Sequence, residues 1–176
     1  MEDLEILEAS PAQVDDVLSL WLEAAHWMVA KGINQWRPEY FSRDIVLDYF
    51  EGRQIFLAKH KGEYVGSFAL QWSDPLVWGN LHNEESGYLH RFVVRRTQAG
   101  HKYGEYFLKW IEDYVKSQNK KYVRLDCMAT NEVLNNYYRQ RDFTFIGTYE
   151  LQAGEHTWLG NLYEKQVSRG LVSLEA

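Results

Sequence analysis

The sequence predicts a mixed α/β fold with a central, mostly antiparallel sheet of about seven strands, flanked by about four helices. Two apolar runs, residues 54–58 and 64–70, enclose a Lys-Gly pair, which is a hairpin signal and predicts antiparallel pairing. Further along, an amphipathic helix pattern separates the strand patterns at residues 88–94 and 122–128. A strand, helix and strand in succession favour a parallel pair, so the predicted sheet is mixed and not doubly wound.

The first strand and the first helix have clear sequence signals. Residues 4–9 alternate weakly and predict a strand. Ser10 can cap a following helix, Pro11 suits its first turn, and Gln13 can complete a capping box. Apolar residues then recur at helical spacing, and Gly32 is a suitable stop, so we expect a helix of about five turns.

The remaining elements follow the same patterns with less regular boundaries. We expect a loop-like aromatic stretch at 33–41, a short helix at 42–51, a long polar connection at 73–86, helices at 100–117 and 130–140, and closing strands at 143–149 and 159–166. The predicted order is β-α-α-β-β-β-α-β-α-β-β. Since no linker, repeat or low-complexity segment interrupts residues 1–176, we expect a single domain.

Composition excludes several classes of function. The net charge of -6 argues against a general nucleic-acid binder, which needs basic patches. No apolar run approaches the roughly 20 residues of a membrane helix, so we expect no membrane partner. The one cysteine, Cys127, cannot form an internal disulfide, and the acidic start lacks a signal-peptide pattern, so we expect a cytoplasmic protein. The six histidines lack metal-ligand spacing, so no metal is expected.

The segment HRFVVRRTQAGHKYGEYFLKWIE carries the strongest functional signal. A strand pattern runs through the basic pair Arg95-Arg96 into a glycine-containing loop that opens a helix. The free N–H groups and the dipole at a helix start favour an anion such as a pyrophosphate, and glycine lets the backbone approach it. The same pattern also occurs in proteins without a ligand.

This segment resembles the acetyl-CoA-binding motif of the GNAT acetyltransferase superfamily, whose loop reads R/Q-x-x-G-x-G/A. Gly104 matches the last position, and Gly100 matches the glycine that often follows the Arg. Ala99 and Lys102 depart from the pattern, and lysine at 102 is tolerable there if its φ is negative.

The following stretch resembles the next strand and helix of the family, often N-x-x-A-x-x-L-Y-x-K-x-G-F. Asn131, Tyr138 and Phe143 match it, whereas Asp142 replaces the glycine. The resemblance covers roughly residues 4–166. It implies that the strands at 88–94 and 122–128 splay apart.

The resemblance also implies site residues, with acetyl-CoA as the co-substrate. The backbone of Phe92, Val93 and Val94 would pair with the pantetheine arm, and Tyr138 would protonate the leaving thiolate. The other residues expected to bind acetyl-CoA are Gly100, His101, Lys102, Tyr103, Gly104 and Asn131.

The general base has several candidates. The segment LHRFVV resembles the LHALAV type of strand in arylalkylamine N-acetyltransferases, which implies His90 in the proton path. Strand alternation would place His90 on one face with Tyr88 and Phe92. Glu84 and Glu85 are alternatives, and a water chain could serve without any single base. An acetyl-cysteine intermediate on Cys127 is a further, less favoured alternative.

The acceptor is a primary amine of a small molecule in our first hypothesis, attacked directly in a ternary complex. We expect Trp36 and Tyr88 to contact it, with Tyr40 and Phe41 as further aromatic neighbours. A protein N-terminus or lysine is the alternative acceptor, and a non-catalytic acyl-CoA sensor is the alternative from another class. The family resemblance also suggests a homodimer, whereas the identity of the amine and the length of the acyl chain stay open.

Overall fold

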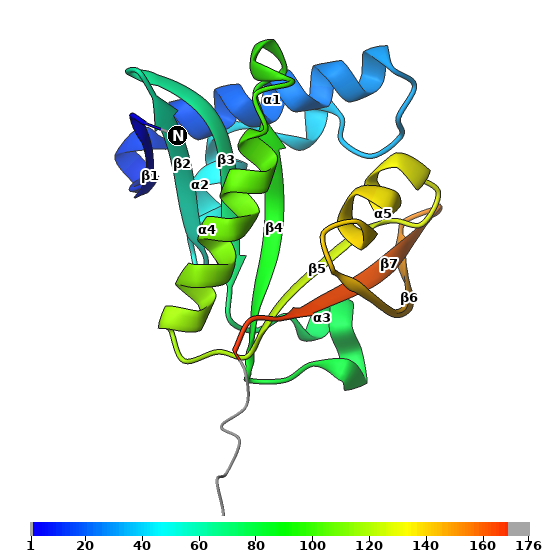
Figure 1. Cartoon of the computed structure of the whole chain (residues 1–176). Coiled ribbons are helices and arrows are strands. Elements are labelled where there is room, and N and C mark those ends of the chain that lie inside the picture. The colour runs from blue at the N-terminus through cyan, green and yellow to red at the C-terminus, as the bar shows by residue number, and fades with distance from the viewer. Residues whose placement is uncertain (1, 169–176) are drawn as a thin grey trace, which may run out of the picture. The chain divides into compact units, whose positions relative to one another are not determined.

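The computed structural model describes residues 2–168 of the 176-residue chain (Figure 1). Its strands are β1 Leu4–Glu8, β2 Gln54–His60, β3 Glu63–Gln71, β4 Ser86–Val94, β5 Tyr122–Met128, β6 Thr144–Ala153 and β7 His156–Gln166. Its helices are α1 Val14–Ala30, α2 Arg43–Tyr49, α3 Pro75–Trp78, α4 Tyr103–Ser117 and α5 Glu132–Arg139. Short 3₁₀ turns lie at Pro11–Gln13, Pro38–Tyr40, Gly79–Leu81 and Arg96–Gln98.

The seven strands form a mixed sheet in the order β1-β2-β3-β4-β5-β7-β6. The pairs β1/β2, β2/β3, β5/β7 and β6/β7 are antiparallel, whereas β4 and β5 are parallel. Their parallel register runs from Ser86 opposite Tyr122 to Leu89 opposite Leu125, which covers only the first part of each strand. The predicted fold class, including the splayed pair, is confirmed.

The chain divides into two compact units. The first contains the residues up to Gln71 together with His90–Leu108, and the second contains Trp72–Leu89 and the chain from Lys109 onward. Both β4 and α4 therefore contribute residues to each unit. The prediction of a single domain stays a prediction.

Helix α1 ends as its sequence predicts, whereas the predicted cap starts a 3₁₀ turn and the regular helix begins later, at Val14. The Ser10 N–H donates to Gln13 Oε1 at 2.9 Å, within a 3₁₀ turn that precedes the regular helix. At the other end Gly32 has a φ of 71°, and the Ile33 N–H donates to the Met28 carbonyl at 2.9 Å. A left-handed glycine with this bond is a common helix stop.

The first unit has a buried layer on each face of its strands. Ile55 and Leu57 of β2 and Ala69 of β3 pack with the apolar faces of α1 and α2. The alternate residues Phe56 and Phe68 stack on each other on the other face, where Phe68 also contacts Phe107 of α4. The alternation explains why β2 and β3 are apolar along almost their whole length.

Two glycines in the β2–β3 hairpin have distinct roles. Lys61 and Gly62 both have positive φ, 49° and 85°, as a tight hairpin turn requires, so the predicted hairpin is confirmed. Gly66 of β3 allows a close approach, because a Cβ there would lie 2.4 Å from the Phe107 ring and 2.7 Å from the Val93 carbonyl oxygen.

The second unit differs from the sequence-based prediction in two places. The polar connection at 73–86 contains the short helix α3, and its last residue, Ser86, already belongs to β4. The closing strands β6 and β7 are longer than predicted and pair up to Ala153 opposite His156. Gly154 turns this hairpin with a φ of 64°.

Among residues 2–168, no helix combines the length and apolarity needed to cross a membrane.

Candidate functional site

The loop between β4 and α4 has the backbone geometry of an anion site. Gly100 has a φ of 91°, and α4 begins at Tyr103 after Lys102. The Tyr106 N–H donates to the Lys102 carbonyl at 3.3 Å, whereas the N–H groups of Lys102, Tyr103 and Gly104 donate to no residue within the described part of the chain. These N–H groups, at the start of a 15-residue helix, fit a pyrophosphate.

Lys102 does not have the backbone conformation expected of it. Its φ is 58°, in the left-handed region, so the condition under which lysine is tolerable here, a negative φ, is not met. The family motif has glycine at this position, and glycine adopts a positive φ without steric cost. The loop therefore keeps its turn with a strained lysine, at a cost of roughly 1–2 kcal/mol.

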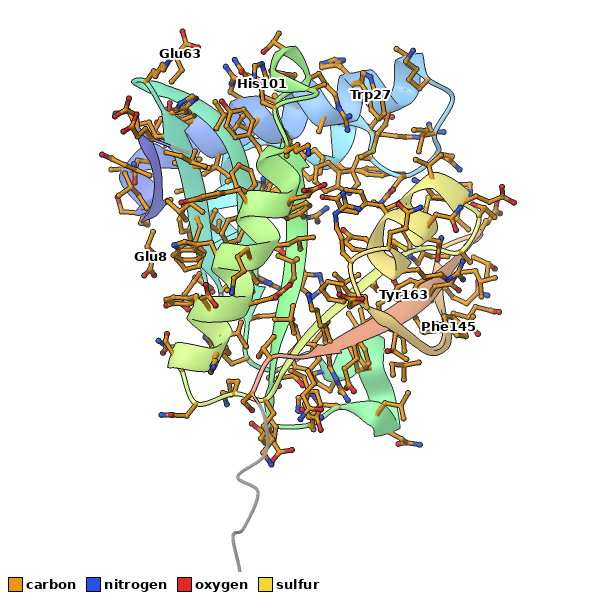
Figure 2. All side chains as sticks on the ribbon, viewed as in Figure 1. Glu8, Trp27, Glu63, His101, Phe145 and Tyr163 are labelled. Atoms are coloured by element: carbon orange, nitrogen blue, oxygen red, sulfur yellow. The ribbon has the colours of Figure 1, made fainter. Side chains whose placement is uncertain are left out.

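Helix α1 holds the first residues of this loop through Glu23. Its Oε1 accepts the Arg96 N–H at 3.0 Å, and its Oε2 lies 3.3 Å from Arg95 Nε. The Arg96 guanidinium lies 3.6 Å from the centroid of the Trp27 ring, and burial lowers the pKa of Arg96. Figure 2 shows Trp27 on α1 and His101 in the β4–α4 loop. Sequence reasoning missed Glu23, which is one of three acidic residues on α1 and has no motif to distinguish it.

Tyr103 fixes the start of α4 from inside the first unit. Its side chain is 2 % exposed, its hydroxyl lies 2.5 Å from His60 Nδ1, and its ring stacks on Phe107. Tyr103 can therefore offer its backbone N–H to a ligand while its side chain anchors the helix to β2.

Strand β4 contains a left-handed residue, Arg91, whose φ is 53°. Phe92 contacts Phe107 of α4, whereas Val93 packs with α1 and α2, so their side chains point to opposite faces. A left-handed residue interrupts the alternation of a strand, so the spacing that placed His90 with Phe92 no longer fixes the face of His90. The role of His90 stays a prediction.

Tyr138 lies on α5, in the second unit, with a buried ring and an unpaired hydroxyl. The side chain is 5 % exposed, and its ring packs edge-on against Phe143. Burial raises the pKa of Tyr138, with smaller contributions from Cys127 and Tyr137. Its hydroxyl forms no hydrogen bond to any residue in the range 2–168. The phenol is therefore a neutral donor at physiological pH, with no acceptor of its own in the described chain.

Asn131 has a structural function that the sequence pattern did not predict. Its side-chain oxygen caps α5 by accepting the Leu134 N–H at 3.1 Å, and its carbonyl accepts from Asn135 Nδ2 at 2.8 Å. The cap explains the residue without a ligand. Binding of acetyl-CoA by Asn131 stays a prediction.

Cys127 has the properties of a buried structural thiol. It is 2 % exposed, and burial together with the neighbouring Asp126 raises the pKa of Cys127 to about 12. A thiol with this pKa is almost entirely protonated at neutral pH and is a poor nucleophile. The acetyl-cysteine alternative therefore loses its support.

The two residues expected to contact the acceptor are both buried. Tyr88 is 0 % exposed, donates to the Asn83 carbonyl at 3.1 Å and accepts from Arg124 Nη1 at 3.3 Å, all within the second unit. Its surroundings give no support to substrate contact. Trp36 is 9 % exposed, in the first unit, and packs edge-on against Phe41.

The first unit contains one group of the predicted residues: Trp36, His90, Phe92, Val93, Val94 and the loop Gly100–Gly104. Tyr88, Asn131 and Tyr138 belong to the second unit. Arg91 was missed, because its side chain is positioned by a backbone conformation that the sequence does not reveal.

Comparisons with known proteins agree with this geometry. Residues 19–143 match the model of the Acetyltransferase (GNAT) family. The chain is 31% identical over 170 residues to the uncharacterized N-acetyltransferase YesJ of Bacillus subtilis (strain 168), covering 91% of this chain and 90% of that protein.

Two solved structures share the fold at low sequence identity. One is a spermidine N-acetyltransferase SpeG chimera from Vibrio cholerae and hSSAT, with a TM-score of 0.71, 12% identity and coverage of 94% and 96% of the two chains. The other is a Salmonella typhimurium acetyltransferase that modifies the N-terminal serine of ribosomal protein L7/L12, with a TM-score of 0.72, 15% identity and coverage of 96% and 97%.

Proposed function

Because the chain belongs to the acetyltransferase (GNAT) family, we propose that it transfers an acetyl group from acetyl-CoA to a primary amine of a small molecule. The chain is an N-acetyltransferase by family, and the acceptor and the site residues are our proposal. The observation that carries it is the set of unpaired N–H groups at the start of α4, which follows, after one loop, the strand that would hold the pantetheine arm.

Acetyl-CoA would bind along β4 and the loop that follows it. The backbone of Phe92, Val93 and Val94 would pair with the pantetheine arm, and the loop Gly100–Gly104 would hold the pyrophosphate. Lys102 adds a positive charge at this loop. Acetyl-CoA itself supplies an activated acyl group in the form of a thioester.

The chain's residues must deprotonate the amine, because an alkylammonium has no lone pair. With a pKa near 10, only about one amine in a thousand is neutral at pH 7. We propose His90, or water ordered beside it, as the base. Glu84 and Glu85 fit less well: Glu84 is 83 % exposed and lies near His82, and Glu85 forms an ion pair with Lys121.

In the transfer step, the amine nitrogen attacks the thioester carbonyl carbon and the C–S bond breaks. The N–H of Val93 or Val94 would polarise the carbonyl oxygen as negative charge develops on it. The amine proton passes to the base, and Tyr138 donates its hydroxyl proton to the leaving thiolate. Burial raises the pKa of Tyr138, so the phenol keeps the proton that it would donate, but the same shift makes it a weaker acid than a free tyrosine.

A small acceptor is favoured over a protein by the packing of the aromatic residues after α1. Trp36 and Phe41 are 9 % and 7 % exposed and pack edge-on against each other, which leaves no wide apolar groove at these two side chains. The related folds include one enzyme named for spermidine and one that modifies a protein N-terminus, so the fold supports both acceptor classes. Protein acetylation therefore stays the second candidate, and family membership favours turnover over a non-catalytic sensor.

Thiol release from acetyl-CoA tests the proposal when amines and peptides are compared in parallel. We expect at least one small primary amine to have a kcat/KM roughly 10-fold or more above that of peptides with free N-termini or lysines. If peptides are acetylated faster than small amines, the acceptor is a protein and the proposal of a small-molecule acceptor is wrong. Binding of acetyl-CoA without turnover of any acceptor would support the sensor instead. We further propose a cytoplasmic location and a homodimer.

A further inference from the structure

The side chain of Arg91 lies in a cage of aromatic rings within the first unit. Its guanidinium carbon lies 5.2 Å from the ring centroids of Trp36 and Phe41, 5.3 Å from Tyr49 and 5.5 Å from Trp21. Each distance is within the range of a cation–π interaction. The cage joins α1, α2 and the connection between them to β4.

The rings of the cage hold one another in place before any ligand arrives. Trp21 contacts Phe41 and Tyr49 edge-on, with centroids 5.7 Å and 5.2 Å apart, and Trp36 contacts Phe41 at 5.3 Å. Trp21 is fully buried. The guanidinium is therefore oriented by rigid neighbours, which lowers the entropy cost of using it to bind a ligand.

Arg91 has no acidic partner of its own. Within residues 2–168 it forms no hydrogen bond and no ion pair. Of the two arginines that follow it on the chain, Arg95 pairs with Glu23, whereas the Arg96 guanidinium lies over the Trp27 ring. Aromatic faces attract the charge of a guanidinium but do not accept its in-plane N–H donors, which match the two oxygens of a carboxylate.

The backbone at Arg91 has a strained conformation. Its φ of 53° is in the left-handed region, which a residue with a side chain rarely adopts within a strand. Strained residues with an unused functional group tend to mark binding sites. Arg91 also directly precedes Phe92 and Val93, the backbone that we propose for the pantetheine arm, so it belongs to the strand where the acetyl group would arrive.

We propose that the Arg91 guanidinium binds a carboxylate of the acceptor, so that the substrate is a small primary amine that also carries an acidic group, such as an amino acid. This inference rests on the proposed function and names its substrate class. The cage holds the guanidinium, the guanidinium holds the carboxylate, and the amine of the same small molecule is thereby kept near β4.

The test compares matched acceptors on the wild type and on Arg91→Met. The probes are free amino acids, the corresponding amino-acid amides, and O-phosphoethanolamine beside ethanolamine. We expect the wild type to prefer an amino acid over its amide by roughly 10- to 100-fold in kcat/KM, since a charge-assisted pair is lost in the amide. Arg91→Met should abolish this preference by slowing only the acidic acceptor, and leave the Kd of acetyl-CoA unchanged.

Two further variants separate binding from packing. Arg91→Lys keeps the charge but not the planar fork, so we expect it to retain part of the preference. Arg53→Met is the matched control, because Arg53 lies 4.2 Å from the Tyr49 centroid but outside the cage, and it should keep the full preference. If the wild type prefers O-phosphoethanolamine over both ethanolamine and the amino acids, the acidic group that Arg91 binds is a phosphate and not a carboxylate.

The outcomes distinguish this inference from the proposed function. Turnover of neutral amines as fast as that of amino acids would overturn the inference and leave the acetyltransferase intact. If Arg91→Met and Arg91→Lys lower kcat/KM equally for acidic and neutral acceptors, Arg91 serves packing and does not bind a carboxylate. Release of no thiol with any probe would overturn the small-molecule function itself, and the inference with it.

Discussion

At the scale of single residues, the loop that starts α4 contains a conformational cost that can be removed. Lys102 has a φ of 58°, where a Cβ crowds the backbone, and the family motif has glycine at this position. The lysine therefore has two opposite effects: its backbone strain destabilises the loop, whereas its positive charge favours an anion there.

We predict that Lys102→Gly raises the free energy of unfolding by about 0.5–1 kcal/mol, because the relief of strain exceeds the greater chain entropy that glycine loses on folding. Denaturation with urea measures the change. Lys109→Gly in the middle of α4 is the control and should lower the free energy of unfolding by about 1 kcal/mol. Destabilisation by both substitutions would contradict the strained conformation at 102.

Some site residues could be predicted from the sequence and others could not. The glycine loop, the free N–H groups at the start of α4 and the candidate role of Tyr138 follow from local spacing and the family motif, and the functions proposed for them stay predictions. The cage around Arg91 does not, because it depends on rings at four distant positions and on a positive φ inside a strand. The complete burial of Tyr88 also could not be predicted, because it depends on tertiary packing, and contact between Tyr88 and the substrate stays a prediction.

At the scale of elements, α1 positions the loop between β4 and α4 through one carboxylate. Glu23 accepts the Arg96 N–H and offsets the charge of Arg95, so it fixes the loop but also reduces its positive potential. The two effects can be separated, because glutamine keeps an acceptor oxygen and removes the charge.

We predict that Glu23→Gln lowers the Kd of acetyl-CoA by about two- to five-fold at low salt, with a smaller effect at high salt, since only the charge is lost. Glu23→Ala should bind more weakly than Glu23→Gln, because the Arg96 N–H then loses its acceptor. Calorimetric titration at two ionic strengths measures both, and Asp16→Asn on the same helix is the control. Identical constants for the glutamine and alanine variants would show that Glu23 does not hold the loop.

Element boundaries were predicted best where turn chemistry is explicit. The β2–β3 hairpin was predicted from its Lys-Gly turn, and α1 from its cap and stop. The length of the β6–β7 hairpin was underestimated. Residues 150–158 are mostly polar and exposed at a two-stranded edge, so burial does not impose an apolar alternation on their sequence.

At the scale of the whole molecule, β6 forms one edge of the sheet and has exposed apolar side chains. Phe145 is 45 % exposed and Ile146 is 36 % exposed, and Figure 2 shows Phe145 on the same hairpin as Tyr163. An edge strand with these residues is suited to pair with another chain. This edge is where we place the proposed homodimer contact.

We predict that the wild type sediments as a dimer and that Ile146→Lys weakens the dimer by roughly 10-fold or more, because a charge then enters an apolar contact. Sedimentation equilibrium measures the association. Thr148→Lys, an exposed position on the same strand, should have a smaller effect. A wild type that is monomeric at every concentration would refute the homodimer.

The most direct test of the account is acceptor-dependent thiol release from acetyl-CoA by the wild type, Tyr138→Phe and Tyr137→Phe. With the best amine from the panel, we predict that Tyr138→Phe lowers kcat by about 100-fold, because the leaving thiolate loses its proton donor. The Kd of acetyl-CoA should stay unchanged, and the adjacent Tyr137→Phe should keep most of the activity. If Tyr138→Phe keeps the kcat of the wild type, Tyr138 is not the general acid. If the wild-type protein binds acetyl-CoA but acetylates no amine, the proposed reaction is wrong.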